Sequence, residues 1–364
     1  MTKYSNEGVL VYIGTYTRGQ SEGIYVYRMD QSSGVLGFAS KAIGVENPSF
    51  LALHPEQRYL YAVNEVGRFA GRLSGAVSSF SINPKTGELT FLNQQPSHGP
   101  GPCYLSVDKT GRFVLVANYE GGSLAVLPIQ DDGHLGAATD FVQHHSSTVG
   151  PRRQRIPHAH CVILDPYNRY VFATDLGLDK IMIYQLDLTQ GKLRPNDEPW
   201  VQVKAGAGPR HLSFHPNGRS AYVINELDST LTAFSYDETH GTLREVQTIS
   251  TLPEGFKGTN DCADVHVSAS GRFVYGSNRG HDSIVVFAVD EDTGELTCVD
   301  HEPTQGRNPR SFVIDPSGTF LLVANQDADT IVTFRVDRQT GRLVSTGHVA
   351  EVPTPVCLKM LAVP

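Results

Sequence analysis

Two arginines, Arg210 and Arg310, occupy equivalent places in the sequence. Each follows a proline and lies one residue before a short apolar run (LSFHP and FVIDP). Arginine is rarely buried without a partner, and two guanidinium groups near one another repel unless negative charge lies between them. A phosphate or carboxylate ligand supplies that charge, and the planar guanidinium suits bidentate binding. We therefore expect an anion-binding pair; the alternative is a structural network with Glu65, Glu226 or Asp264.

Histidines and acids near the same points could carry protons. Histidine is the usual proton carrier near neutral pH, and carboxylates can serve as general bases when their pKa is tuned. The candidate catalytic residues are His160, His211, Glu65 and Glu226. We expect His54 and His215, in His-Pro turns, to be structural, and His266 to lie in the core. Solvated loops are expected for His98, His134, His144, His145, His240, His301 and His348.

Aligning the repeated segments adds further polar residues. The pairs that precede each short strand are Ser49-Phe50, Cys103-Tyr104, His160-Cys161, Arg210-His211, Ala263-Asp264 and Arg310-Ser311. The pairs that follow the next strand are Asn64-Glu65, Asn118-Tyr119, Thr174-Asp175, Asn225-Glu226, Asn278-Arg279 and Asn325-Gln326. The repeated Asn suits a strand-ending turn, because it tolerates left-handed backbone and bonds its own backbone, although Asn side chains could also hold an oxyanion. The candidates for substrate binding are Arg210, Arg310, Arg279, His158, Asn118, Tyr119, Tyr104 and Asp264.

A metal site would compete for the same side chains. His158 and His160, two residues apart on an extended segment, would point the same way and could share a metal. However, the chain has no HExxH motif, no CxxC pair and no cluster of carboxylates. It also lacks a GxSxG elbow, a P-loop and a GxGxxG motif. We expect neither a metal nor a cofactor.

A repeat of about fifty residues organises the chain. A glycine before a leucine closes each period, at Gly34, Gly87, Gly133, Gly191, Gly241, Gly294 and Gly341. Between these anchors come short β-branched and aromatic runs such as YLYAVN, FVLVAN and FLLVAN, separated by turns rich in Gly, Asn and Asp. A fixed period of this length indicates a repeat architecture rather than two unrelated domains.

The expected fold is an all-β, seven-bladed β-propeller with four-stranded antiparallel blades, forming a single domain over residues 1–364. The segment VLVYIGTY near the N-terminus begins in mid-blade, and PTPVCLKMLAV near the C-terminus resembles an inner strand with nothing after it. Together they should complete one blade and close the ring. The ligand site is expected at the mouth, where the loops entering the inner strands gather.

Composition narrows the possible partners. The 364 residues carry 30 Lys and Arg against 38 Asp and Glu, a net charge of −8, which argues against a broad nucleic-acid surface. The five scattered cysteines fit a reducing compartment. No membrane span or export signal is evident, so a cytoplasmic protein without membrane partners is expected. The sequence does not indicate an oligomeric state.

Several motifs resemble those of the seven-bladed β-propeller lactonase family. They are GTYT at 14–17, GPCY at 101–104, VANYEGGS at 116–123, PHAH at 157–160, GPRH at 208–211, NEL at 225–227 and SNRGHDSI at 277–284. The resemblance covers essentially the whole chain. Bacterial members are 6-phosphogluconolactonases of the pentose phosphate pathway, and a fungal branch comprises carboxy-muconate cyclases. Tyr104 stands where the family pattern has histidine, so the resemblance implies no acid–base role there.

The resemblance implies hydrolysis of a sugar lactone, foremost 6-phospho-D-glucono-1,5-lactone. A lactonising enzyme of the carboxy-cis,cis-muconate cyclase type is the first alternative, since it too needs anion-binding arginines and a proton carrier. A non-catalytic binding scaffold is the second. It would require an apolar rim, whereas the rim loops QDDGH, DETHG and DEDTG are polar, which favours a small-molecule lactone as the partner.

Overall fold

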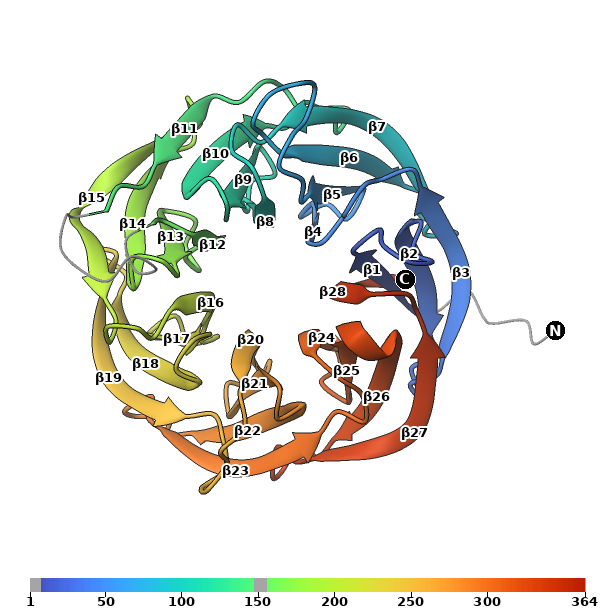
Figure 1. The fold of residues 1–364 in the computed structure, drawn as a ribbon, viewed down its shortest axis with the longest axis vertical. Helices are drawn as coiled ribbons and strands as arrows, with labels where there is room; N and C mark the ends of the chain where they lie inside the picture. Colours follow the sequence, from blue (N-terminus) through green and yellow to red (C-terminus); the bar gives the residue numbers. More distant parts are fainter. Residues whose placement is uncertain (1–7, 147–155, 364) are drawn as a thin grey trace.

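The computed structural model describes residues 8–146 and 156–363, and they form a ring of seven four-stranded antiparallel sheets (Figure 1). The predicted single domain of 1–364 also included residues 1–7, 147–155 and 364, which lie outside the described residues. The predicted seven-bladed propeller is confirmed. Within the described ranges, no helix is long and apolar enough to cross a membrane.

We number the blades from the one that holds both ends of the described chain. Blade 1 consists of β28 (Pro355–Val363), β1 (Gly8–Thr15), β2 (Gly23–Met29) and β3 (Leu36–Ile43). Blade 2 consists of β4 (Leu51–Leu53), β5 (Tyr59–Asn64), β6 (Ala76–Ile82) and β7 (Leu89–Pro96). Blade 3 consists of β8 (Pro102–Val107), β9 (Phe113–Asn118), β10 (Ser123–Pro128) and β11 (Asp140–Gln143). Blade 4 consists of β12 (Ala159–Leu164), β13 (Tyr170–Asp175), β14 (Lys180–Asp187) and β15 (Lys192–Gln202).

The remaining blades follow the same order from the axis outward. Blade 5 consists of β16 (Pro209–Phe214), β17 (Ser220–Asn225), β18 (Thr230–Asp237) and β19 (Thr242–Ser250). Blade 6 consists of β20 (Asp261–Val267), β21 (Phe273–Arg279), β22 (Ser283–Val289) and β23 (Leu296–Pro303). Blade 7 consists of β24 (Pro309–Ile314), β25 (Phe320–Asn325), β26 (Thr330–Val336) and β27 (Leu343–Glu351), with a short 3-10 helix η2 (Gln326–Ala328) after β25.

Blade 1 closes the ring with strands from opposite ends of the chain, as predicted. β1 pairs with β28 in antiparallel register, from Val9 opposite Ala362 to Gly14 opposite Cys357. The two strands lie side by side at the axis, while β2 and β3 continue outward (Figure 1). The pairing leaves no unpaired inner edge on β1.

Burial follows the position of a strand within its blade. The second strands β5, β9, β17 and β25 are buried along their whole length, because neighbouring blades cover both faces. The outer strand β27 is buried only at its first residue and then runs through half-buried and exposed residues, as expected when one face meets water. This difference explains why the inner runs read as continuous apolar segments.

The repeated glycines join one blade to the next. Gly133 has a φ of 85°, and an added Cβ would lie 2.3 Å from the Tyr59 ring. Its carbonyl accepts a hydrogen bond from the Tyr61 hydroxyl at 3.3 Å. The pair Tyr275 and Gly341 repeats the contact at 2.9 Å. The glycine is therefore required both for its left-handed backbone and for the close approach of an aromatic ring.

Candidate active site

A β-bulge aims the site residues inward. In blades 4, 5 and 7 the pairing of the inner strand with its neighbour skips one residue, and the skipped residues are His160, Arg210 and Arg310. A bulge re-aims the extra side chain and tightens the local twist. These side chains gather at the end of the ring where the inner strands begin, which we call the mouth. The residues that follow the second strands, Glu65, Glu226 and Arg279 among them, complete it.

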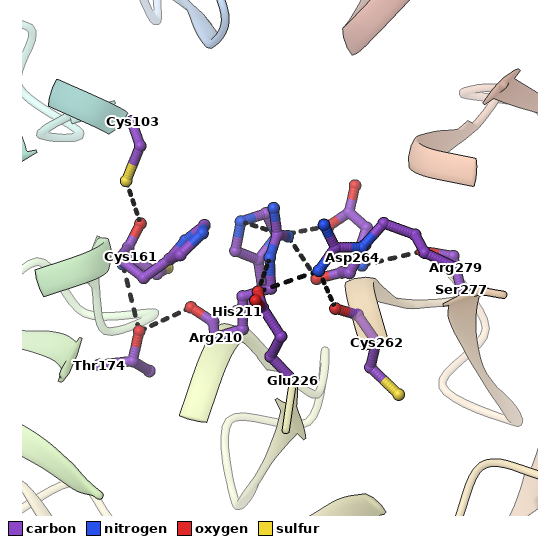
Figure 2. Close-up of polar contacts among 12 residues, drawn as sticks. Cys103, Cys161, Thr174, Arg210, His211, Glu226, Cys262, Asp264, Ser277 and Arg279 are labelled. Carbon is purple, nitrogen blue, oxygen red and sulfur yellow. Dashed lines mark hydrogen bonds and ion pairs between the residues drawn. The ribbon is translucent and has the colours of Figure 1, made fainter. Parts of the chain in front are cut away.

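Glu226 holds two arginines together (Figure 2). Its Oε2 lies 2.9 Å from Arg210 Nε and 3.0 Å from Arg279 Nη2. Burial alone would raise the pKa of Glu226, but the surrounding guanidinium groups, Arg279 foremost, lower it. Burial, with the nearby Arg210, lowers the pKa of Arg279 to about 10. Glu226 is thus held as a carboxylate that fixes both guanidinium groups.

Backbone carbonyls fix the same arginines from the other side. Arg210 Nη1 donates to the Ala263 carbonyl at 2.6 Å, and Arg279 Nη2 donates to the Cys262 carbonyl at 2.8 Å. The Thr174 hydroxyl, in the preceding blade, donates to the Arg210 carbonyl at 2.6 Å. Three blades therefore determine where the Arg210 side chain lies.

His211 lies beneath Arg210 and is bonded on both ring nitrogens. Nδ1 is 2.8 Å from Asp264 Oδ1, and Nε2 is 3.2 Å from Arg210 Nη1. Because a guanidinium can only donate, Nε2 is the acceptor and Nδ1 carries the proton. Burial first, and then Arg210, lower the pKa of His211 to about 4, against the opposing effect of Asp264. His211 is therefore a neutral imidazole whose free lone pair is already used.

His160 is buried without such partners. Its side chain is in edge contact with His211 and with Tyr119, at ring-centroid distances of 5.2 and 5.5 Å. Among the described residues, its buried Nδ1 has no hydrogen-bond partner. Burial and the positive charge of the mouth, Arg210 foremost, hold the pKa of His160 well below its usual range. A buried polar atom left unpaired is costly, so it marks a place where a ligand or water can bind.

Arg310 differs from the other two arginines. Its guanidinium lies 5.5 Å from the centroid of the Tyr16 ring. Within the described residues it has no carboxylate partner at ion-pair distance. Burial would lower the pKa of Arg310, but Tyr16 and Glu65 outweigh it and raise that pKa. Arg310 is a permanently charged group with donors to spare.

The sequence alignment did not include Tyr16, and it placed Ser49 in the column before the inner strands without choosing it as a site residue. The Tyr16 hydroxyl lies 3.1 and 3.0 Å from the two Glu65 oxygens, and Ser49 Oγ also donates to Glu65. Tyr16 directly follows β1, the second strand of blade 1, just as Glu65 follows β5. It is the seventh member of the column in which six pairs were aligned, and extending that column to the N-terminal blade would have found it.

The other predicted site residues are divided between several places. His158 stacks on Tyr119 at 4.5 Å, and its Nδ1 lies 3.0 Å from the Tyr119 carbonyl. Tyr104 and Asp264 lie deeper along the axis, around His211. Asn118 is fully buried, with Nδ2 donating to the Ser97 carbonyl, so the structure does not bring it to the mouth.

Four expectations about the histidines are wrong. His301 and His348 are half-buried on the outer strands β23 and β27, and do not lie in solvated loops. His144 is not solvated: it is buried, and its Nδ1 lies 2.6 Å from Asp175 Oδ2. His266 is not a core residue, because a third of its side chain is exposed and it lines a cavity. The strand-ending asparagines are structural as expected, but none has left-handed backbone. Asn64, for example, accepts from Ser78 and donates to the Glu46 carbonyl.

Comparison with known proteins identifies the family to which the chain belongs. The family model described as "Lactonase, 7-bladed beta-propeller" matches residues 10–360. The chain belongs to the seven-bladed β-propeller lactonase family. It is 40% identical to the 6-phosphogluconolactonase of Bacillus subtilis over 99% of both chains, and 35% identical to that of Formosa agariphila over 84% of this chain and 86% of the relative.

Solved structures agree with this family assignment. The periplasmic gluconolactonase of Pseudomonas aeruginosa superposes with a TM-score of 0.91 and 39% identity, covering 98% of this chain and 99% of that one. The predicted family and its enzyme class, the carboxylic ester hydrolases that open lactones, are thereby confirmed. In the part of the chain that is described, no group of three or more His, Cys, Asp or Glu side chains is placed to hold a metal ion.

Proposed function

We propose that this lactonase hydrolyses a phosphorylated sugar lactone, 6-phospho-D-glucono-1,5-lactone, to 6-phosphogluconate in the pentose phosphate pathway. The observation that carries the proposal is Arg310, a partly buried cation with no carboxylate at ion-pair distance among the described residues. It lies in the same mouth as His160, whose buried Nδ1 has no hydrogen-bond partner among those residues. The relatives named 6-phosphogluconolactonase support the phosphorylated substrate.

The charge balance of the mouth favours an anionic substrate. Three guanidinium groups, those of Arg210, Arg279 and Arg310, face two carboxyl groups, those of Glu65 and Glu226. Excess positive charge in a buried site is unfavourable unless an anion compensates it. Because Glu226 already pairs with two arginines, the phosphate is best placed on Arg310.

His160 is proposed as the general base. It would accept a proton from water as the oxygen of that water bonds to the lactone carbonyl carbon. The N–H groups of Arg210 and Arg279 that Glu226 and the backbone leave free would stabilise the negative charge on the carbonyl oxygen. When the bond to the ring oxygen breaks, the protonated His160 returns its proton to that oxygen, giving the acid and a hydroxyl group.

Binding of the phosphorylated substrate should itself raise the pKa of His160. Burial first, and then the cations of the mouth, hold the pKa of His160 low, which makes it a weak proton acceptor in the free enzyme. A bound phosphate would offset that positive charge and raise the basicity of the imidazole. His211 is proposed as a positioning residue rather than a base, because Arg210 and Asp264 engage both of its nitrogens. Glu226 is likewise proposed to position the arginines.

The test is turnover of freshly prepared 6-phosphogluconolactone by the purified protein, with the spontaneous hydrolysis rate subtracted. Unphosphorylated gluconolactone and a chelator are run in parallel. We expect rapid, chelator-insensitive hydrolysis that is faster on the phosphorylated lactone. Equal rates on the two lactones would contradict the phosphate assignment, and no turnover of either would shift the proposal to muconate-type acids. Cell fractionation would test the cytoplasmic location that this pathway implies.

A further inference from the structure

A cavity of about 450 Å³ opens at the end of the ring opposite the mouth. Its wall includes the turns that follow the inner strands, Asp165-Pro166 and His215-Pro216. His211 and Asp264 form part of its inner end, so their outer edges face the cavity while His211 contacts Arg210 on the side of the mouth. We call this cavity the far chamber. Its volume is in the range of small-molecule sites.

Lys359 supplies an uncompensated charge in the far chamber. It lies on β28, is half-buried, and its Nζ is 4.5 Å from the centroid of the Phe50 ring. Among residues 8–146 and 156–363, no carboxylate lies within ion-pair distance of it. A partly buried ammonium group is normally paired with negative charge. The ring of Phe50 stabilises the cation only in part.

The nearby acids are not available to Lys359. Asp264 accepts from His211 Nδ1 at 2.8 Å and from Ser311 Oγ at 3.1 Å, and His266 Nε2 lies 3.2 Å from it. Asp165 accepts from the backbone of its own turn and from the Tyr236 hydroxyl at 3.0 Å. Because these oxygens are already engaged, the positive charge of Lys359 remains for a ligand.

His266 adds a second polar contact. Its Nε2 is fixed on Asp264, while its Nδ1 makes no hydrogen bond with any described residue, and a third of the side chain is exposed. Phe50 and Tyr104, whose rings stack with centroids 4.0 Å apart, supply an aromatic part of the wall next to Lys359. The far chamber therefore combines a cation and a polar ring nitrogen with an aromatic surface.

We propose that the far chamber is a second binding site, for a small organic anion. The carboxylate or phosphate of that anion pairs with Lys359 and contacts His266, and its ring or apolar body lies against Phe50 and Tyr104. The site is distinct from the mouth, whose free cation is Arg310, and it does not depend on the proposed lactone substrate.

Calorimetric titration tests the site with benzoate and phenyl phosphate, which share the ring and differ in the anionic group. The full chain carries Arg310→Met, so that the free cation of the mouth is absent. We expect saturable one-site binding of at least one probe, and the stronger probe identifies the anionic group. Adding Lys359→Met should weaken binding at least about tenfold, whereas Lys359→Arg should retain it. Lys85→Met, at an exposed turn of blade 2, is the matched control and should have no effect.

Two titration results would overturn the proposal: no saturable binding of either probe, or binding that Lys359→Met leaves unchanged. The lactonase rate of Lys359→Met in the otherwise unchanged chain separates the two sites. A rate equal to that of the unmodified protein supports a separate far chamber, and loss of activity in a folded variant contradicts it. The proposed lactone substrate is judged independently, from turnover by the unmodified protein.

Discussion

His160 combines deep burial with a ring nitrogen that has no partner among the described residues. This combination separates a residue poised for chemistry from one that supports the fold. His54 is also buried, yet its Nε2 is 3.0 Å from the Gly111 carbonyl in the next blade, and so it is engaged in structure. The distinction between the two histidines depends on contacts across blades.

Replacing His160 with Gln tests the proposed general base. We expect kcat to fall about 10²- to 10⁴-fold, the usual contribution of general acid–base catalysis. Tm should change little, because Nδ1 makes no hydrogen bond that would be lost. Steady-state kinetics and thermal unfolding measure the two effects. His54→Gln is the control and should lower Tm while kcat is retained; an unchanged rate in His160→Gln would remove it from the reaction.

The pH dependence of the rate follows from the direction of the His160 pKa shift. Because that pKa lies well below its usual range, the free enzyme keeps a neutral imidazole as the pH falls below about 6.5. We expect kcat/KM to stay level through that region and to decline only at lower pH. Arg310→Met removes a cation that lowers the pKa, so it should move the decline to higher pH. A midpoint at the ordinary histidine value in the unmodified enzyme would contradict this account.

The role of a single residue could be predicted from the sequence where its chemistry imposes one requirement, as a buried arginine requires a negatively charged partner. Arg210 was predicted to need negative charge, and the structure pairs it with Glu226, which also holds Arg279. Arg310, predicted together with Arg210, has no carboxylate at ion-pair distance among the described residues. Sequence reasoning failed for His144, which follows β11 and whose partner Asp175 lies 31 residues away at the end of β13. Because the burial of His144 depends on a residue far away in the chain, the sequence around His144 shows no pattern that would predict it.

At the scale of the strand, the bulge is the device that builds the mouth. Inner strands begin at Pro102, Pro209 and Pro309, positions where the missing N–H is tolerated, and the next residue is the bulged one. The alignment of pairs before each strand placed these residues in one column. It did not predict the bulge, because the register of pairing depends on the neighbouring strand as well.

Thr174→Val tests whether the connection between blades positions Arg210. The Thr174 hydroxyl donates to the Arg210 carbonyl and accepts from the Cys161 backbone N–H at 3.1 Å. Valine keeps the shape but leaves both groups unpaired, which should cost about 1–3 kcal/mol of unfolding free energy. We also expect KM to rise, because Arg210 loses its support. Denaturant unfolding and kinetics measure both, and Thr297→Val on the exposed face of β23 should change neither.

The closed ring was predictable because the same pattern of glycine turns and apolar strands recurs seven times along the sequence. Each anchor glycine, each apolar run and the incomplete first and last segments pointed to the same closed propeller. The far chamber was not predicted. Its inner end depends on how Phe50, Tyr104 and His211 pack across three blades, which no single repeat specifies.

Closure of blade 1 can be tested by deleting residues 353–364. This removes β28, exposes the edge of β1 and opens the ring, so we expect unfolding or aggregation. Thermal unfolding and size-exclusion chromatography measure the outcome, and a synthetic peptide of residues 353–364 added in trans should partly restore the folded form. A truncated chain with the original Tm would show that the pairing of β1 with β28 is not needed for stability.

The central claim is that Arg310 is the cation that selects a phosphorylated lactone. The most direct test compares kcat/KM for 6-phosphogluconolactone and gluconolactone in the unmodified enzyme, in Arg310→Met and in Arg307→Met, which alters an exposed arginine in the loop just before β24. The account predicts a strong preference for the phosphorylated lactone that Arg310→Met abolishes, chiefly through KM, and that Arg307→Met retains. A preference that survives Arg310→Met, or that is absent from the unmodified enzyme, would contradict it.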